Sequence, residues 1–375
     1  MKTKGKAISA ICVVTCALFL VSACNNEVSL DWNLANVGAE VRCHTSVQRN
    51  YVDGDYTKIS TYAKGTEELS RPQAVNFSWS AENNGAQALA ESYTVEISLT
   101  EDFAESVKYE TAETQLDVYN LLLGSLYFWR VTANLGGGQK STSSVSLFTT
   151  SAAAPRNLYI DGITNARDLG GWETSSGRVK QGMIYRCGRL NESKRADVNI
   201  EITDIGIKEM KEVLGVKTEV DLRKSDNGET GGITSSPLGN GVKYVNIPMD
   251  GTMGSNCLTD TKYHPAIKQF FTLLADESNY PIAFHCDIGT DRTGFFAFLI
   301  NGLAGVAEED LYRDYLFSNF GNIGGSRSLT NIKSYVDTIK NSQGADLSEK
   351  IENCLINTVG VKKSEIDALR AIMTA

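Results

Sequence analysis

Hydrophobic and polar positions alternate one by one in the part of the chain that begins near residue 70. Val75, Phe77 and Trp79 would share one face of a strand whose other face carries polar side chains. The same period of two recurs in three further segments: 93–100, 127–134 and 145–147. Short alternating strands separated by turns rich in asparagine and glycine predict an all-β, immunoglobulin-like sandwich over residues 70–150. Its aromatic side chains are expected to form the core of the sandwich rather than a ligand groove.

The pattern changes after a short linker of small residues at 151–157. Segments with the pattern of strands now alternate with segments expected to be helices. The expected strands are 216–222, 242–249 and 281–284. The expected helices are 266–275, with apolar residues at helical spacing, and 295–303, which is mostly apolar and therefore expected to be buried. Residues 331–375 look helical apart from a break at 341–344. Strands alternating with helices predict an α/β domain over residues 158–375, with a central, mostly parallel sheet flanked by helices.

The N-terminus has the pattern of a signal peptide. Three lysines within the first six residues precede an uncharged, mostly apolar run at 7–23, which is short for a membrane span of about 20 residues. The end of this run, Val-Ser-Ala-Cys at 21–24, resembles the lipobox of bacterial lipoproteins. That resemblance implies cleavage after residues 1–23, a lipid at Cys24 and an anchor in the bacterial cell envelope, at the periplasmic face or the cell surface. The weakly patterned segment 24–69 is then expected to be a tether. An ordinary signal peptide with a chance cysteine is the alternative.

Charge and composition narrow the possible functions. The chain has 36 lysines and arginines against 45 acidic residues, a net charge of -9. Nucleic-acid binders are usually basic, so no nucleic-acid partner is expected, and an anionic substrate must be bound by a local cluster. The eight cysteines and three histidines form no CxxC pair and no zinc-site spacing, so we expect neither a metal nor another cofactor.

One loop carries the candidate chemistry, between the expected strand 281–284 and the expected helix 295–303. It reads His285-Cys286-Asp287-Ile288-Gly289-Thr290-Asp291-Arg292-Thr293-Gly294. A strand-loop-helix turn leaves backbone N–H groups unpaired at the helix start, and these bind anions. Cys286 would lie in positive potential that favours its thiolate, and Arg292 can fold back to offer two phosphoryl oxygens a planar fork. Gly289 would let the backbone approach the anion closely. Together they predict phosphoryl transfer onto sulfur.

This loop resembles the HCX5R loop of the cysteine-dependent protein tyrosine phosphatases. Asp291 before Arg292 makes it most similar to the bacterial tyrosine phosphatases and their fungal dual-specificity relatives. Four other segments resemble that family in the expected order: N-x-R-D-x-G-G at 165–171, Y-R-S at 185–187, where this chain has Cys187, D-L-R at 221–223 and the closing helix at 360–370. Residues 121–131 of the sandwich resemble the E–F corner of fibronectin type III domains.

The resemblance implies a phosphatase that hydrolyses phosphomonoesters, above all phosphotyrosine and with dual specificity as an option, through a phosphocysteine. Cys286 would be the nucleophile, Arg292 the clamp on the transferred group, and either Asp291 or Asp250 the general acid, with Asp291 slightly favoured. Asp226 and Asp260 are weaker candidates for the acid. The residues expected to contact or surround the phosphate are Asp287, Ile288, Gly289, Thr290, Thr293, His285, Arg223 and Arg167. Surface ion pairing is the alternative for the two arginines.

Two other functions stay open. Relatives that act on inositol phosphates or phosphoinositides often have lysine where this chain has Thr290, so such a substrate is an alternative to a phosphorylated protein or small phosphomonoester. The chain could also be a catalytically weak envelope lipoprotein whose sandwich binds a partner that the sequence does not identify. Finally, Cys187 could protect Cys286 by a reversible disulfide, although a cysteine that simply fills a serine-sized pocket is the more ordinary case.

Overall fold

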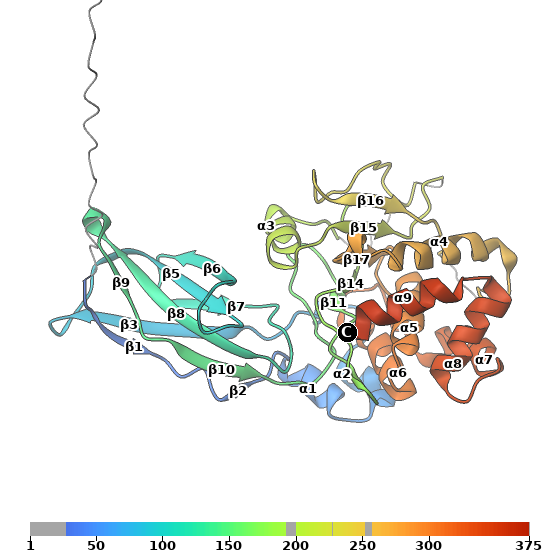
Figure 1. The fold of residues 1–375 in the computed structure, drawn as a ribbon, viewed down its shortest axis with the longest axis horizontal. Helices are drawn as coiled ribbons and strands as arrows, with labels where there is room; N and C mark the ends of the chain where they lie inside the picture. Colours follow the sequence, from blue (N-terminus) through green and yellow to red (C-terminus); the bar gives the residue numbers. More distant parts are fainter. Residues whose placement is uncertain (1–27, 193–199, 227, 252–256, 375) are drawn as a thin grey trace, which may run out of the picture.

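The structure is a computed structural model that describes residues 28–192, 200–226, 228–251 and 257–374 (Figure 1). The expected signal peptide and Cys24 lie outside the described residues. Within those ranges, no helix combines the length and the apolar character that a membrane crossing requires. Figure 1 shows two parts, a β-rich one and one in which helices surround a sheet.

The β-rich part consists of two sheets that face each other across an apolar core. One contains β1 (Asp31–Leu34), β3 (Val75–Asn83), β4 (Ala86–Gln87) and β7 (Gln115–Val118). The other contains β2 (Glu40–Val41), β5 (Ala90–Ser98), β6 (Ser106–Thr111), β8 (Leu126–Leu135), β9 (Lys140–Thr142) and β10 (Ser146–Thr150). All pairs are antiparallel except β2 with β10. The aromatic residues expected in the core are buried there: Phe77, Trp79, Tyr93, Tyr127 and Trp129.

The last strand of the sandwich has the opposite facing from the one its pattern suggested. Val145 and Leu147 are 42% and 60% exposed, whereas Phe148 is fully buried. The register of β10 on β8 places Phe148 opposite Tyr127, and the two rings stack with centroids 5.5 Å apart. Because side chains alternate along a strand, burying Phe148 turns Leu147 outward.

Residues 28–69 contain regular elements where the weak pattern predicted a tether. β1 and β2 join the sandwich, and two short helices follow, α1 (Ser46–Val52) and α2 (Ile59–Tyr62). Figure 1 draws these helices in blue beside α6 of the other part. Tyr51 of α1 is fully buried against Phe317 and Phe320. The chain therefore packs against the second part of the molecule before it forms the remaining strands of the sandwich.

The second part is built on a five-stranded sheet in the order β11-β14-β17-β15-β16. Its strands are β11 (Arg167–Asp168), β14 (Ile184–Cys187), β15 (Thr218–Asp221), β16 (Lys243–Asn246) and β17 (Ile282–His285). All neighbours are parallel except β11 with β14. A small hairpin, β12 (Glu173–Thr174) and β13 (Gly177–Arg178), lies outside it. This confirms the predicted α/β domain with a mostly parallel sheet.

Helices cover both faces of this sheet. One face packs on α3 (Asp204–Lys208) and the π-helical turn Glu209–Val213 that continues it. The other face packs on α4 (His264–Leu274), α5 (Asp291–Leu303), α6 (Glu308–Phe317), α7 (Lys333–Lys340), α8 (Leu347–Cys354) and α9 (Lys363–Thr374). The apolar run at 295–303 is indeed a buried helix, α5, but it begins four residues earlier, directly after the candidate loop.

Candidate active site

Cys286 occupies the turn from the central strand β17 into helix α5. The strand is completely buried, and Cys286, only 2% exposed, starts the loop that ends where α5 begins at Asp291. Within the described part of the chain, the backbone N–H groups of residues 288–292 have no hydrogen-bond acceptor. The first amide to find one is that of Gly294, which donates to the Thr290 carbonyl at 2.8 Å. A row of unpaired amides at a helix N-terminus is an anion-binding arrangement.

Gly289 is required by the packing of the loop, while a close approach of its backbone to an anion stays a prediction. Its φ is +68°, a conformation that favours glycine. A Cβ at this position would stand 2.3 Å from the carbonyl oxygen of Cys187, at the end of β14. The loop therefore lies directly on the end of the neighbouring strand, and a side chain here would push the loop away from it.

Arg292 folds back over the loop and is held there by three acceptors. Its Nη1 donates to Glu229 Oε2 at 2.7 Å and to the carbonyls of Leu222 and Met249 at 3.3 and 3.1 Å. Burial acts to lower the pKa of Arg292, but the facing Cys286 and Glu229 outweigh it and raise the pKa above its ordinary value. Its Nε and Nη2 donate to nothing among the described residues, so the guanidinium is charged, fixed and still able to bind two oxygens.

His285 orients the loop and does not face a substrate. The side chain is fully buried, with Nε2 3.0 Å from Glu219 Oε1 and Nδ1 3.1 Å from the Cys286 carbonyl oxygen. Both ring nitrogens are thus engaged by the protein. His285 therefore supports the loop, and the prediction that it contacts or surrounds the phosphate is corrected.

Arg167 does not reach the phosphate site either. Its guanidinium is fully buried and donates to Asp314 Oδ1 at 2.7 Å and to Ser318 Oγ at 3.1 Å. Asp314 also accepts from Arg186 Nη1 at 2.6 Å, and Arg186 Nη2 donates to the Gly289 carbonyl at 2.7 Å. Burial acts to raise the pKa of Asp314, yet the two arginines hold it below its ordinary value. Asp314 thus binds both arginines, and through Arg186 it helps to hold the loop at Gly289.

Arg223 has a comparable supporting role, in place of the expected phosphate contact. It is fully buried and binds Asp221 at 2.7 Å and Asn191 Oδ1 at 2.6 Å, and it donates to the Glu229 carbonyl at 3.0 Å. It therefore fixes the segment that carries the carboxylate partner of Arg292. Arg223 therefore acts on the phosphate site indirectly, through Glu229.

The remaining loop side chains are also engaged or buried. Asp287 pairs with Arg189 at 2.9 Å, which offsets the negative charge next to Cys286. Thr290 is fully buried, and its hydroxyl donates to the Ile288 carbonyl at 3.3 Å. The Thr293 hydroxyl is buried without a partner in the described residues. Buried hydroxyls normally have a hydrogen-bond partner, so the unpartnered Thr293 hydroxyl, on the first turn of α5, is available as a donor.

The two candidate acids lie in different surroundings. Asp291 accepts from Arg327 Nε at 3.0 Å and from the Tyr315 hydroxyl at 3.3 Å. Asp250 pairs with Lys224 at 3.2 Å and Lys262 at 3.3 Å, and hydrogen bonds from these two lysines hold its pKa below the ordinary value. A Cβ on the next residue, Gly251, would stand 3.6 Å from Arg292 Nη2.

The weaker candidates stand beside Asp250. Asp226 and Asp260 contact the same two lysines, at 3.8 and 3.4 Å. Their carboxylates are 74% and 39% exposed, so they extend the charged rim rather than the site itself.

The cysteines are all free thiols where the structure describes them. Cys187 is buried in β14, paired in register with His285, and burial raises its pKa far above the ordinary value. A thiol in that state is a poor nucleophile. The residues described here contain no group of three or more potential metal ligands.

Three residues that build the site were not found from the sequence: Glu219, Glu229 and Asp314. Asn165 opens the N-x-R-D-x-G-G segment, but its contact with the loop was not predicted. Glu219 left one usable signal, because it is a charged residue inside a segment predicted to be a strand of the central sheet, and the structure buries all of β15. Glu229 lies on a loop and Asp314 on α6, and neither has a distinguishing spacing. Only the folded chain brings them to the loop.

The family model for the tyrosine phosphatase family matches residues 158–375, which is more than half of the chain. The chain therefore belongs to the tyrosine phosphatase family, a family of phosphoric monoester hydrolases, as the loop resemblance implied.

Curated relatives agree with this assignment. A protein of Cupriavidus necator, named as a candidate tyrosine-protein phosphatase, is 30% identical over 190 residues, 44% of this chain and 64% of its own length. A tyrosine-protein phosphatase of Nostoc commune is 39% identical over 54 residues, 14% of this chain and 18% of its own length. The chain thus spans less than two thirds of the length of either relative.

Two solved structures show a low overall likeness. The core catalytic domain of the PP-IP phosphatase SIW14 from S. cerevisiae, in complex with citrate, is 17% identical, with a TM-score of 0.27 over 42% of this chain and 83% of that one. TpbA of P. aeruginosa is 20% identical, with a TM-score of 0.29 over 46% and 85%. At these scores neither likeness bears on the substrate.

Proposed function

We propose that the protein hydrolyses phosphomonoesters, phosphotyrosine first among them, through a phosphocysteine at Cys286. The observation that carries this proposal is the cradle of unpaired amides at 288–292 around a buried cysteine, with Arg292 folded over it by Glu229. The thiolate attacks phosphorus, an S–P bond forms and the P–O bond to the leaving group breaks. Water then attacks phosphorus, the S–P bond breaks, and inorganic phosphate leaves with the thiolate restored.

The transition state has charge on three equatorial oxygens, and the site offers donors for each of them. The loop amides and the two free nitrogens of Arg292 are already in place, so little reorganisation accompanies the reaction. Thr293 has a buried hydroxyl without a partner among the described residues, and a thiolate is the acceptor that it lacks. A hydrogen bond from Thr293 would make the sulfur a better leaving group in the second step.

We assign the general acid to Asp250 rather than to Asp291. Asp291 is held by Arg327 and Tyr315, whereas Asp250 precedes a glycine that lies against the Arg292 guanidinium. Lys224 and Lys262 keep Asp250 ionised in the described state, which suits the activation of water in the second step. For the first step Asp250 must give up its contacts with these lysines and become protonated. It then delivers that proton to the leaving oxygen.

The loop favours substrates with a single phosphate. Thr290 is fully buried and uncharged where an inositol-phosphate enzyme would need a cation, and Lys224 and Lys262 are engaged with Asp250. An inositol-phosphate or phosphoinositide phosphatase is the alternative. A panel of phosphotyrosine, phosphoserine and phosphothreonine peptides and inositol phosphates separates the two, because the proposed enzyme releases phosphate from phosphotyrosine peptides fastest.

Hydrolysis of p-nitrophenyl phosphate tests the chemistry itself. Cys286→Ser should abolish turnover while tungstate still binds, since the cradle consists mostly of backbone. Cys354→Ser, a buried thiol of α8 away from the loop, is the matched control and should turn over like the parent. Residual turnover in Cys286→Ser at the control's rate would refute the phosphocysteine. Complete inactivity of the parent would favour the catalytically weak binding protein.

We also propose that residues 1–23 are a lipoprotein signal and that a lipid on Cys24 anchors the protein in the bacterial envelope. The sandwich would then be a fibronectin type III-like domain between the anchor and the enzyme. One contact supports this identity: the N–H of Leu122 donates to the Tyr127 hydroxyl at 2.8 Å, which resembles the tyrosine corner of such domains. Cys24→Ala should move the protein from the membrane fraction to the soluble fraction, and unchanged membrane association would contradict the anchor.

A further inference from the structure

The segment that follows α2 is in close contact with the second part of the molecule, residues 158–375, which we call the catalytic part. We call residues 63–70 the strap; it leads from α2 to the first long strand of the sandwich. Gly65 donates to the Asn319 carbonyl at 2.8 Å and accepts from Ile323 and Gly325 at 3.1 and 2.9 Å. Leu69 donates to the Phe320 carbonyl at 2.6 Å. The strap is thus hydrogen-bonded along much of its length to the segment 319–325.

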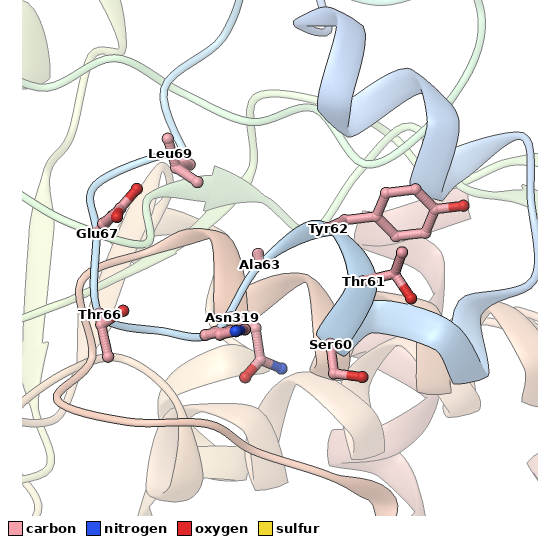
Figure 2. Close-up of a pocket in the computed structure, with 9 residues that line it drawn as sticks. Ser60, Thr61, Tyr62, Ala63, Thr66, Glu67, Leu69 and Asn319 are labelled. Carbon is pink, nitrogen blue, oxygen red and sulfur yellow. The ribbon is translucent and has the colours of Figure 1, made fainter.

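The packing around Gly65 shows that this contact is specific. Gly65 has a φ of +69°, and a Cβ there would stand 2.5 Å from the Gly325 carbonyl oxygen, so only glycine fits. Figure 2 shows the other side of the strap, where a pocket of about 230 Å³ is lined by α2, the strap and Asn319. Asn319 reaches the strap from the catalytic part and binds Arg327 on both its backbone N–H and carbonyl, at 2.7 and 3.0 Å.

Two chains of contacts connect the strap to the loop at residues 286–292, which we call the phosphate loop. In the first, Ser70, 2% exposed, accepts the backbone N–H of Asn165 at 3.1 Å. Asn165 has a φ of +58° and donates from its side chain to the Ile288 carbonyl at 3.1 Å and to Thr290 Oγ1 at 3.3 Å. Ser70 therefore holds the residue that holds the loop.

The second route runs through the segment that Gly65 binds. Asn319 fixes the backbone of Arg327, and Arg327 in turn donates to both carboxylate oxygens of Asp291, at 3.0 and 3.3 Å. Asp291 is the last residue before Arg292 and the first residue of α5. The two routes thus end on the same short stretch, residues 288–291.

We propose that the strap positions the phosphate loop, with Ser70 as its main positioning residue, so that the catalytic unit includes residues that precede the sandwich. The inference rests on the proposed function, because it concerns how that site is held. The family match begins at residue 158 and leaves this segment out. Without Ser70, Asn165 loses the acceptor for its backbone amide, and the loop amides lose their fixed direction.

Tungstate binding tests the proposal, because tungstate fills a phosphate loop without turnover. Affinities are measured by calorimetry on the chain from residue 24, in a Cys286→Ser background. Ser70→Ala should weaken tungstate binding about fivefold or more, while Ser60→Ala, an exposed hydroxyl on the pocket rim in Figure 2, should leave it unchanged. Tungstate affinity of Ser70→Ala within twofold of the parent would overturn the positioning role.

A double-mutant cycle separates positioning from general support of the fold. If Ser70 acts through Asn165, the effect of Ser70→Ala on tungstate affinity should disappear in an Asn165→Ala background. Full additivity of the two substitutions would overturn this route. Failure of the parent itself to bind tungstate would instead refute the proposed function.

A milder pair serves if Ser70→Ala does not fold. Glu68 accepts hydrogen bonds from the Ser70 hydroxyl and backbone N–H, and its other carboxylate oxygen accepts from the Asn322 N–H at 3.4 Å. Glu68→Gln should weaken tungstate binding two- to fivefold, whereas Glu67→Gln, its exposed neighbour on the strap, should not. Equal affinities in the two variants would count against the strap as a positioning element.

Discussion

The sandwich and the catalytic part bury different kinds of side chain. The sandwich core is apolar and aromatic, with Phe77, Trp129 and Phe148 completely enclosed between the sheets. The largest fully buried side chains of the catalytic part include four arginines, each facing a carboxylate or a carbonyl: Arg167, Arg186, Arg189 and Arg223.

This difference separates stability from positioning. Burying apolar area stabilises a fold directly, at about 25 cal/mol per Å². A buried ion pair loses hydration and gains little net stability, although removing one partner is strongly destabilising. The buried arginines contact the phosphate loop, or the residues that hold Arg292 and the loop in place. The catalytic part therefore uses ion pairs to fix the direction of a loop, and the sandwich has no comparable requirement.

The largest effect is expected where two of these arginines share one partner. Asp314→Asn keeps the shape but leaves Arg167 and Arg186 without their buried charge partner, so unfolding should become easier by about 3–5 kcal/mol. The turnover of p-nitrophenyl phosphate by the folded protein should also fall, because Arg186 holds the Gly289 carbonyl. Denaturant unfolding and steady-state kinetics measure the two effects.

The matched control for that variant lies on the same helix. Asp310 pairs with Arg313 at the surface side of α6, with 29% of its carboxylate side chain exposed. Asp310→Asn should change both stability and turnover little. Equal losses in the two variants would show that the buried network has no special role.

A variant in the sandwich should change the stability of the protein without changing its turnover of p-nitrophenyl phosphate. Phe77→Ala removes a ring that packs on Trp129 and Phe148, so the sandwich should lose about 3–5 kcal/mol of stability. Turnover of the folded protein should stay at the parent value, because Phe77 contacts no residue of the catalytic part's core. Leu89→Ala, at a side chain that is 92% exposed, is the control. A drop in kcat with Phe77→Ala would break the division between the two regions.

The two regions also differ in how well the sequence predicted them. Apolar runs such as those of β17 and α5 are unambiguous, because a strand or helix buried on all sides needs no partner information. The loop between them was found from residue types at fixed offsets. The alternation at 145–147 favours Leu147 on the core face, which is wrong, because the facing of β10 depends on a contact between strands, the stacking of Phe148 on Tyr127.

Buried polar networks were the least predictable feature. Asp314 has the spacing of any residue on α6, and nothing in its neighbours shows that it faces two arginines. Arg167 and Arg223 were expected at the phosphate because arginine binds phosphate, but the same geometry binds carboxylates, and here carboxylates are nearer. Tyr51 and Ser70 lie in a polar stretch in which buried residues are isolated, so their spacing shows neither a helix nor a strand pattern.

The contact between the regions should respond to pH through His44. Burial lowers the pKa of His44 to about 4, below its unfolded value near 6.5, and the ring binds the Pro155 carbonyl at 2.8 Å. The neutral form is therefore favoured in the fold. Its contribution to stability is complete above pH 6.5 and is lost as the pH falls from 6.5 toward 4, by up to about 3 kcal/mol.

His44→Gln isolates this contribution. Glutamine can still donate to the Pro155 carbonyl but does not titrate, so the loss of stability between pH 7 and pH 4.5 should be smaller than in the parent. Unfolding midpoints in denaturant at several pH values give the comparison. Parallel curves for the two proteins would rule His44 out as the source of the pH dependence.

The smallest expected effect concerns the corner of the sandwich. Tyr127→Phe keeps the ring in the core, stacked on Phe148, but removes the hydroxyl that accepts the Leu122 N–H. Because Leu122 is partly exposed, water can replace part of that bond, and the sandwich should lose about 1 kcal/mol. Tyr93→Phe, whose buried ring has no hydroxyl partner among the described residues, should lose less than half as much. Equal losses would mean that the corner bond adds nothing beyond the ring, and the likeness to a tyrosine corner would then be one of shape alone.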